Sequence, residues 1–308
     1  MKDNHTPCVL CFGEVLWDIF PEGMKPGGAP LNVAYHLNRL GLDSHIISRV
    51  GSDVLGDRML QQIADWGVSA SFCQQDIQFP TGTVETEMDD KCDVTYDIVY
   101  PVAWDFIGWE ARYQQQAVRA DALVFGSLIM RHAVSRETLL KLLPAASYRV
   151  FDVNLRQPHY TAEKVLAVLP QTDLLKLNED ELAIISRWLE AAEAPELEAV
   201  RLLQERFGIA EILVTRGGKG ATYYSGGKSR DSAVYKVKVA DTVGSGDAFL
   251  AAFLSGRFSG KDFGQEQLDF AAGLGAFVAS QNGACPPYDQ KDLQRFMAQH
   301  QQVSGLNG

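Results

Sequence analysis

Short apolar segments and helix-like segments alternate along most of this 308-residue chain. CVLCFGEV (8–15), SHIISRVG (44–51) and TDLLKLN (172–178) are short and largely apolar, as buried strands are. Helical segments lie between such strands; APLNVAYHLNRLG (29–41), for example, places its leucines on adjoining helix faces and ends at a glycine. This alternation predicts a doubly wound α/β fold, in which a mostly parallel sheet is flanked by helices on both faces.

One of the predicted helices is apolar nearly all round. Residues 246–258 (GDAFLAAFLSGRF) have no wide polar face, so this helix is expected to be buried. The chain is 46% hydrophobic, which suffices for the large core that such burial needs. Parallel sheets place ligands beyond the carboxyl ends of their strands. The chemistry is therefore expected in the loops after DVN (152–154), LLKLN (174–178) and ILVTRGG (212–218).

Residues 81–105 interrupt the alternation of strands and helices. Their side chains alternate with period two, which predicts two or three antiparallel strands. Together with residues 16–26 they are expected to form a small separate sheet, and so small a sheet rarely stands alone. A lid over a ligand cleft and a plain hairpin excursion are equally compatible with this pattern. As no linker is evident, residues 1–308 are expected to form a single domain into which these two segments are inserted.

Charge and composition narrow the class of protein. The formal net charge of −11 argues against nucleic acid or an anionic membrane as the main partner. The polar start MKDNHTP leads directly into a strand, and no apolar stretch is long enough to span a bilayer. Five scattered cysteines favour a reduced, cytoplasmic protein. Cys8 and Cys11 would point to opposite faces of a strand, so we expect no zinc site from this pair.

The segment DTVGSGDAF (241–249) joins a glycine-rich turn to the apolar helix. Its glycines allow the amides of Gly244, Ser245 and Gly246 to approach a ligand, and free amides at a helix start bind anions. Asp247 lies in the first turn of that helix. There its carboxylate would either complement the helix dipole or act as a base beside a transferring phosphoryl group. Taken alone, the segment supports both roles equally.

Two further sets of polar residues lie near the ends of predicted elements. GGAPLN (27–32) brings Gly28 and Asn32 to a helix start, which is either an ordinary loop or a place where backbone and amide meet a polar ligand. Asp18 follows the first strand and would suit a pair of hydroxyl groups.

The segment LNEDE places Asn178 and Glu181 at a strand end, where acids either complement a helix dipole or hold magnesium through water. VTRGGKGA, with Thr215, Gly217 and Gly220, would form a phosphate cradle or a hairpin turn.

Taken together and in this order, the motifs resemble the PfkB, or ribokinase-like, family of carbohydrate kinases. GGAPLNVAYHLNRLGLDSHIISRVG (27–51) is similar to the family's N-terminal signature, and DTVGSGDAFLAAF (241–253) to its C-terminal signature. NEDE (178–181) is similar to its N-x-x-E motif. The resemblance covers about residues 8 to 288. It implies an α/β domain with a β-sheet lid that transfers the γ-phosphate of ATP to a sugar hydroxyl.

The resemblance also implies a role for each matching residue. Asp247 would be the catalytic base, and the amides of Gly244, Ser245 and Gly246 would form the anion hole. Asp18, Gly28 and Asn32 would bind the sugar. Asn178 and Glu181 would lie near the phosphates and magnesium, and Thr215, Gly217 and Gly220 would contact ATP. In members of the family that use a monovalent cation such as K⁺, Asp241 and the loop near Gly283 would hold it.

Several positions and segments bear on the two ligands, the sugar and ATP. Leu16 stands where ribokinases have an asparagine for the sugar, and Ala272 stands where several relatives carry a polar residue towards adenine. CFGEVLWDIFP and GGAPLN look more like bacterial fructokinases, which makes D-fructose the expected substrate. Arg156 in FDVNLRQPHY would suit an ATP phosphate, a substrate carboxylate or a surface salt bridge. FDVNLRQPHY is shared with fructokinases and also with 2-keto-3-deoxygluconate kinases.

Alternatives remain open within and beyond the kinase class. Another acceptor, such as 2-keto-3-deoxygluconate or a nucleoside, would use the same fold, but Lys91 is the only Lys or Arg in 81–105, which favours a neutral sugar. Tyr96, Tyr100 and Trp104 would cover the sugar, pack the lid itself or form a dimer through paired lids. A non-catalytic sensor is a further alternative. An oxidoreductase is disfavoured because the first strand does not lead into G-x-G-x-x-G.

Overall fold

A nine-stranded sheet forms the centre of the molecule. The structure, a computed structural model, describes residues 6–20, 23–88, 94–260 and 263–302. The strands follow the order β13-β12-β11-β10-β9-β8-β1-β4-β5, in which β11 to β5 run parallel and β12 and β13 form an antiparallel edge. Their bounds are β1 (Cys8–Phe12), β4 (Asp43–Gly51), β5 (Ser69–Asp76), β8 (Ala122–Gly126), β9 (Arg149–Asp152), β10 (Leu174–Asn178), β11 (Glu211–Thr215), β12 (Ala221–Ser225) and β13 (Lys228–Asp231).

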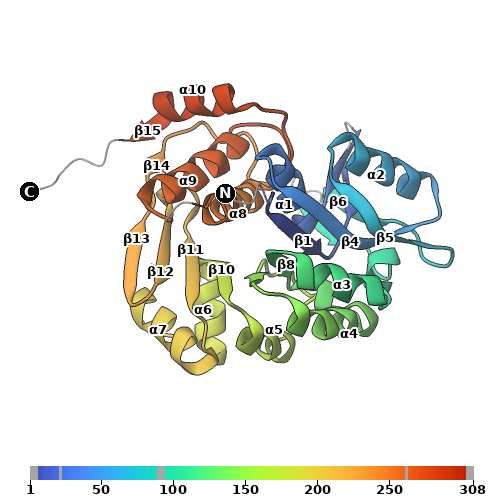
Figure 1. Cartoon of the computed structure of the whole chain (residues 1–308), viewed down its shortest axis with the longest axis horizontal. Coiled ribbons are helices and arrows are strands. Elements are labelled where there is room, and N and C mark those ends of the chain that lie inside the picture. Colours follow the sequence, from blue (N-terminus) through green and yellow to red (C-terminus); the bar gives the residue numbers. More distant parts are fainter. Residues whose placement is uncertain (1–5, 21–22, 89–93, 261–262, 303–308) are drawn as a thin grey trace, which may run out of the picture.

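Helices cover both faces of this sheet, as the alternation predicted (Figure 1). One face carries α1 (Ala29–Arg39), α2 (Val54–Asp65), α8 (Ser245–Arg257) and α9 (Gln265–Ala279), and α10 (Gln290–His300) packs on α9. The other face carries α3 (Ala111–Arg119), α4 (Ala133–Leu142), α5 (Ala162–Val168), α6 (Glu179–Trp188) and α7 (Glu196–Phe207). The doubly wound α/β fold is thus confirmed. Short elements complete the chain: β14 (Val234–Tyr235), β15 (Gln301–Gln302) and the 3₁₀ turns Leu128–Met130, Leu143–Ala145, Leu169–Gln171 and Gly217–Lys219.

Strand β1 shows why the sheet has a core on each face. All of its residues are buried, and successive side chains enter opposite cores. Val9 and Cys11 belong to the cluster beneath α1 and α8, whereas Cys8, Leu10 and Phe12 belong to the cluster beneath α3 to α7. Cys8 and Cys11 therefore lie on opposite faces, as expected from the alternation.

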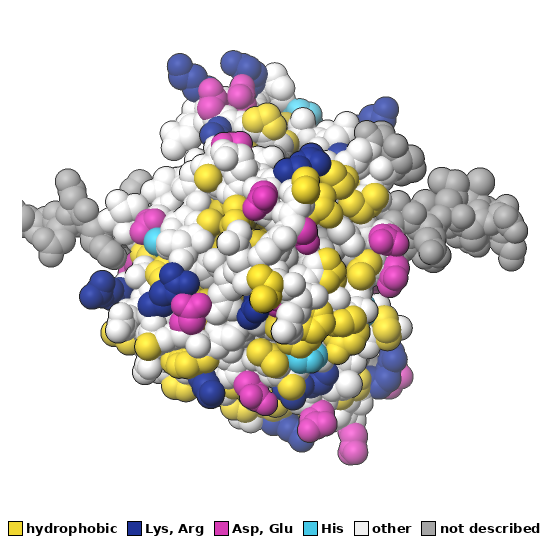
Figure 2. All heavy atoms as spheres, turned by 90° about the vertical axis from the view of Figure 1, so that its right-hand side faces the viewer, with side chains coloured by type: hydrophobic (Ala, Val, Ile, Leu, Met, Phe, Trp, Pro, Cys, Tyr) yellow, Lys and Arg dark blue, Asp and Glu magenta, His cyan; other side chains and the backbone are white. Residues whose placement is uncertain are grey.

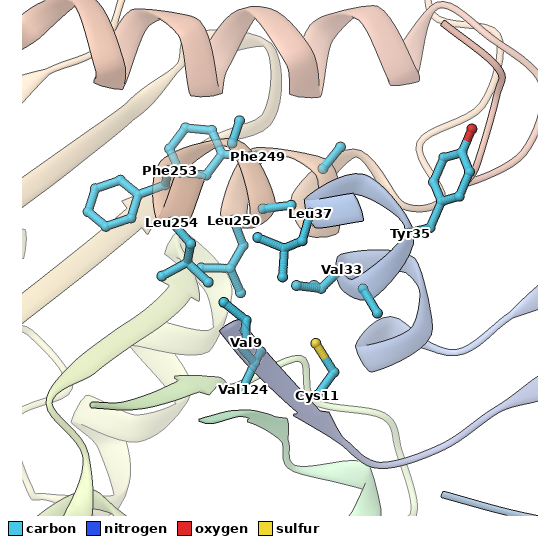
Figure 3. Close-up of a cluster of buried hydrophobic side chains, with 14 of the residues drawn as sticks. Val9, Cys11, Val33, Tyr35, Leu37, Val124, Phe249, Leu250, Phe253 and Leu254 are labelled. Atoms are coloured by element: carbon cyan, nitrogen blue, oxygen red, sulfur yellow. The ribbon is translucent and has the colours of Figure 1, made fainter. Parts of the chain in front are cut away.

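Helix α8 is buried between α1, α9 and the sheet. Figure 3 shows Leu250 and Leu254 of α8 directed towards β1, beside Leu37 of α1. Residues 248 to 254 are all buried. The all-round apolar sequence of this helix is explained by these contacts, and the prediction of a buried helix is confirmed.

A second sheet of four strands is formed by the two segments that break the alternation. It comprises β3 (Gly23–Gly27), β2 (Leu16–Phe20), β6 (Gly82–Met88) and β7 (Val94–Ile98), in this order. Within residues 81–105 the predicted antiparallel pairing is found between β6 and β7, and β2 and β3 also pair antiparallel. The two segments join through β2 and β6, which pair in parallel; the long excursion through α1 to β5 between them allows this. The sheet itself ends at Ile98.

Residues after Ile98 leave the second sheet and join the main core. Ala103–Phe106 form a 3₁₀ turn in which Trp104 is fully buried beneath the guanidinium of Arg131, 3.9 Å from the ring centre. Trp104 therefore packs in the core and has no surface with which to cover a sugar, whereas Tyr100 is 53% exposed. The side chain of Tyr96 lies outside the described residues.

The surface of the described chain shows no large segregation of charge on the side that carries α2 and β5. Acidic, basic and hydrophobic side chains are interspersed there (Figure 2). Within the described ranges, every helix is too short or too polar to cross a lipid bilayer.

We predict that Phe253→Ala in α8 lowers the free energy of unfolding by about 3–5 kcal/mol, because it removes a large buried ring. The ring lies 4.5 Å from that of Phe263 and 5.1 Å from that of Tyr223. Urea unfolding monitored by circular dichroism measures the change. The matched control, Ile77→Ala at a 90% exposed position, should stay within about 0.5 kcal/mol. Equal losses in both variants would contradict the packing described for α8.

Candidate active site

The start of α8 lies at the carboxyl edge of the parallel strands. Gly244, the N-cap residue, has φ of 76°, and a side chain there would collide with Ala284. The amide of Ser245 donates within the preceding turn at 3.3 Å. The amides of Gly244, Gly246 and Asp247 have no hydrogen-bond partner in the described part of the chain. Unpaired amides at the positive end of a helix form a site for an anion the size of phosphate.

Asp247 joins this anion site to helix α1. It is 8% exposed, and its Oδ2 accepts a hydrogen bond from Nδ2 of Asn32 at 2.8 Å. The carboxylate makes no hydrogen bond to the start of its own helix, so it is not a side-chain cap. Burial, and then the charge of Asp152, raise the pKa of Asp247 to about 6, although Lys176 opposes the rise. A carboxylate that titrates near neutral pH is suited to accept a proton.

Asp18 lies on strand β2 of the second sheet, and Gly28 is the N-cap residue of α1, the helix that carries Asn32. Gly28 has φ of 110°, and a side chain there would collide with the backbone oxygen of Glu14. Asp18 lies on β2, where burial, and then the charge of Asp241, raise its pKa to about 6. The cations Arg156 and Lys25 oppose this rise, so both lie close enough to act on Asp18.

Glu14 is a site residue that sequence reasoning missed. It is 2% exposed, its Oε1 accepts from the amide of Ala29 at 3.3 Å, and its Oε2 has no partner among the described residues. Burial is the main cause that raises the pKa of Glu14 to about 7, and Asp247 adds to it. Its place in GEVLWD gave no sign of burial at the start of α1, because that contact depends on the tertiary fold.

Asn178 and Glu181 form a reciprocal cap at the start of α6. Oδ1 of Asn178 accepts from the amide of Glu181, and Oε2 of Glu181 accepts from the amide of Asn178, both at 2.9 Å. Oε1 of Glu181 also accepts from the amide of Leu155 at 2.8 Å, which ties the loop after β9 to α6. Burial raises the pKa of Glu181. The helix-start role is therefore observed, and the metal role remains a prediction.

A buried ion pair lies between Glu181 and Asp247. Nζ of Lys176 on β10 donates to both carboxylate oxygens of Asp152 on β9, at 2.8 and 2.7 Å. Sequence reasoning placed chemistry in the loops after these strands but named neither residue. Alternation within a strand could have indicated that both side chains face α8, since Leu174 and Val150, two residues earlier, do so.

Thr215, Gly217 and Gly220 line a cavity of about 270 Å³ beside the anion site. The cavity extends to Ser245 and Gly246, and its far wall is formed by apolar and small residues: Ala233, Tyr235, Val237, Phe249, Ala272, Gly275 and Ala276. Such a wall fits the flat face of a nucleobase next to a phosphate-binding helix start. The three sequence-predicted residues thus lie together, and Ala272 lies in the same cavity.

Asp241 and Arg156 complete the predicted set. Oδ1 of Asp241 accepts from the amide of Val243 at 3.0 Å, and Oδ2 accepts from the amide of Gly283 at 3.1 Å. Asp241 therefore joins the two loops expected to hold a monovalent cation. Arg156 is exposed, and in the described chain its side chain makes no ion pair, only a bond to the carbonyl of Leu155. Its charge acts on Asp18, Glu14 and Asp247 instead of on a surface partner.

The opposite edge of the sheet holds a separate group of possible metal ligands. Ligand atoms of Cys8, Asp43 and His45 lie within 4.8 Å of one another, at the amino ends of β1 and β4. Nε2 of His45 and Oδ2 of Asp43 already form a hydrogen bond at 3.0 Å, and burial raises the pKa of the Cys8 thiol to about 11. The group is drawn from two strands, so ligand spacing along the sequence could not reveal it.

Comparison with known proteins identifies the family. Residues 12–291 match the model of the pfkB family carbohydrate kinases. The chain belongs to the pfkB family. It is therefore an ATP-dependent carbohydrate kinase, as the two glycine-rich signatures predicted.

This pfkB kinase is similar to several fructokinases along most of its length. It is 31% identical to a fructokinase of Klebsiella pneumoniae, with 80% of this chain and 83% of the relative covered. It is 29% identical to a fructokinase of Vibrio alginolyticus, with 93% and 98% covered. A double mutant of Vibrio cholerae fructokinase, in its fructose-, ADP- and potassium-bound form, superposes with a TM-score of 0.81 at 25% identity, over 96% of this chain and 99% of the other.

We predict that kcat/KM of this pfkB kinase decreases below about pH 6, by up to tenfold per pH unit. Asp247 accepts a proton only when ionised, and its raised pKa means that the ionised fraction falls as the pH drops through about 6. A coupled kinase assay from pH 5 to 8 measures the profile. Asp18→Asn and Glu14→Gln are the controls for the other carboxyls of the site whose pKa values lie in this range, about 6 and about 7. If activity stays constant down to pH 5, Asp247 is not the titrating base.

Proposed function

We propose that this pfkB kinase phosphorylates D-fructose, with Asp247 as the general base. The observation that carries the proposal is the contact between Asp247 and Asn32 directly beside three unpaired amides. It brings a buried carboxylate, the side-chain amide of Asn32 on α1 and an anion site together at the first turn of α8. The fructokinases among the similar proteins support fructose as the acceptor, and Leu16 in place of an asparagine disfavours ribose.

In this mechanism the protein orients the acceptor and stabilises charge. Asn32, Asp18 and the backbone at Gly28 bind the sugar so that one hydroxyl points at Asp247. Asp247 takes the hydroxyl proton as the oxygen attacks the γ-phosphorus of ATP. The amides at the start of α8 stabilise the negative charge on the transferring group without reorganisation. ATP itself would lie in the cavity lined by Thr215, Gly217 and Gly220.

The residues present fit Mg²⁺ held through water. Each carboxylate oxygen of Glu181 accepts one backbone amide, which leaves further lone pairs for water. Asn178 lies beside it at the exposed end of β10. When bound, Mg²⁺ would neutralise phosphate charge. Asp241, whose oxygens join two loops, would hold K⁺ through these loops together with backbone carbonyls.

We further propose that the four-stranded sheet acts as a lid. Asp18 lies on its strand β2, and Lys25 lies opposite on β3. The Lys25 side chain reaches the loop of the main domain at Gly283, with Cδ 3.3 Å from the position that a Cβ would take there. In this proposal the sheet covers the sugar side of the site and would exclude water from it. Pairing of two such sheets in a homodimer is part of the same hypothesis.

A second candidate substrate is an acid sugar such as 2-keto-3-deoxygluconate. The sequence argument against it was the lack of cations in residues 81–105; Lys91 itself lies outside the described residues. The structure brings a different pair, Lys25 and Arg156, to the neighbourhood of Asp18. Two cations without an ion-pair partner in the described chain would suit a carboxylate.

We predict that a coupled kinase assay detects phosphorylation of D-fructose with a higher kcat/KM than that of ribose, adenosine or 2-keto-3-deoxygluconate. Arg156→Gln and Lys25→Gln, assayed on the same panel, report whether the two cations serve the acceptor. If they do, both variants lose activity on the acid sugar more than on fructose. Phosphorylation of another acceptor but not of fructose would contradict the substrate, while the kinase assignment would stand.

We predict that Asp247→Asn lowers kcat by several orders of magnitude and leaves ATP binding within a few-fold. The variant keeps the shape of the side chain but removes the proton acceptor. Isothermal titration with ATP and a single-turnover assay separate the two effects. Asp57→Asn is the matched control, since Asp57 occupies the same first turn of another helix, α2, and is exposed. Near-normal turnover in Asp247→Asn would overturn its role as base.

A further inference from the structure

Lys176 is a charged residue in the interior of the main sheet. It is the third of five residues in β10, between β9 and β11, and is 6% exposed. Burial of an ammonium is costly unless the charge is paired and its donors are satisfied. Its neighbours Leu174, Leu175 and Leu177 are fully buried and apolar. A lysine at this position therefore needs an explanation beyond the packing of the strand.

The ammonium of Lys176 has one N–H donor that does not bind its partner, Asp152. Two N–H groups donate to the two carboxylate oxygens of Asp152. A lysine ammonium has three donors, and the third has no partner in the described chain. Nζ lies 3.3 Å from the position that a Cβ would take at Gly246. The spare donor is thus held directly against the first turn of α8, beside the unpaired amides.

The charges around Lys176 keep it protonated. Its ammonium forms a buried ion pair with the carboxylate of Asp152, with Nζ 2.7 Å from Oδ2. A positive charge is therefore fixed between the proton acceptor and the carboxylate that the metal site would use. Asp152 holds the ammonium from one side and leaves its other side facing α8.

A second buried ion pair shows what a structural pair looks like in this fold. Arg131 binds both oxygens of Asp105, at 2.7 and 2.8 Å. Two further N–H groups donate to the carbonyls of Ile98 and Val99, at 3.2 and 2.7 Å. Four of the five donors of that guanidinium are therefore bound by protein oxygens. Lys176 differs in lying against the anion site, where its third donor adjoins the unpaired amides at the start of α8.

We propose that Lys176 is a catalytic residue whose ammonium, held by Asp152 beneath Gly246, donates a hydrogen bond to the transferring γ-phosphoryl group of ATP. In this step the acceptor oxygen forms a bond to the γ-phosphorus, and the bond from that phosphorus to the β,γ-bridging oxygen breaks. The bridging oxygen leaves on ADP with the electron pair, and the hydroxyl proton goes to Asp247. Lys176 keeps its protons and stabilises the charge that spreads over the equatorial oxygens.

This inference rests on ATP-dependent phosphoryl transfer and not on the identity of the sugar. Its test is nucleotide binding in the absence of any acceptor. Lys176→Met should weaken binding of β,γ-imido-ATP about tenfold or more relative to binding of ADP, because only the former carries a γ-phosphoryl group. Titration calorimetry at fixed free Mg²⁺ measures both dissociation constants. In single-turnover assays the rate of phosphoryl transfer should fall on the order of 10²–10³-fold.

Controls separate this role from a structural one. Arg131→Met breaks the other buried pair and should leave the ratio of the two dissociation constants unchanged. Because Lys176→Met leaves Asp152 buried without a partner, Lys176→Met/Asp152→Asn is the second variant and restores a neutral pair. Asp152→Asn alone retains the ammonium and should change the ratio less than the double variant does. The proposal is overturned if the double variant and Asp152→Asn have the same ratio of the dissociation constants of β,γ-imido-ATP and ADP. It is also overturned if Lys176→Met has the wild-type ratio and the wild-type rate of phosphoryl transfer.

Discussion

The burial of α8 against α1 and β1 is the constraint on which the site depends. Because this helix is apolar all round, it has only one place in the fold, the layer between the sheet and α9. Its rigid position fixes where its first amides point and where Asp247 lies. Asn32 on α1 reaches Asp247 for the same reason, since α1 and α8 share a core (Figure 3). Packing energy in the core is thus what orients the groups that would bind phosphate and sugar.

The sequence predicted those parts of the fold that local pattern controls. The alternation of strands and helices, the burial of α8 and the glycine turn at Gly244 all follow from periodicity and backbone freedom. The parallel pairing of β2 with β6 could not be predicted, because it depends on how a distant segment folds back. Trp104 shows the same limit: its sequence neighbours suggested the small sheet, but the chain had already turned into the main core.

Prediction of the site was limited in a different way. Motifs indicated the loops, and they led to Asp247, Asn32 and the cavity lined by Thr215, Gly217 and Gly220. Glu14 and the pair of Lys176 with Asp152 were missed, since strand interiors carry no motif of their own. What makes these residues notable is burial together with an unused donor or acceptor. That combination is a property of the tertiary structure and has no signature in residue spacing.

The charges of the site also explain why a phosphate donor would need cations there. The carboxyl groups that act on one another outnumber the basic groups: Glu14, Asp18, Asp152, Glu181, Asp241 and Asp247 against Lys25, Arg156 and Lys176. Several of these carboxyls have raised pKa values because burial and neighbouring carboxylates disfavour their charge. A nucleotide adds further negative charge to the same volume. A divalent metal ion and the buried ammonium of Lys176 would offset the negative charge of the phosphates. Asp247, on the sugar side, could then remain ionised and accept a proton.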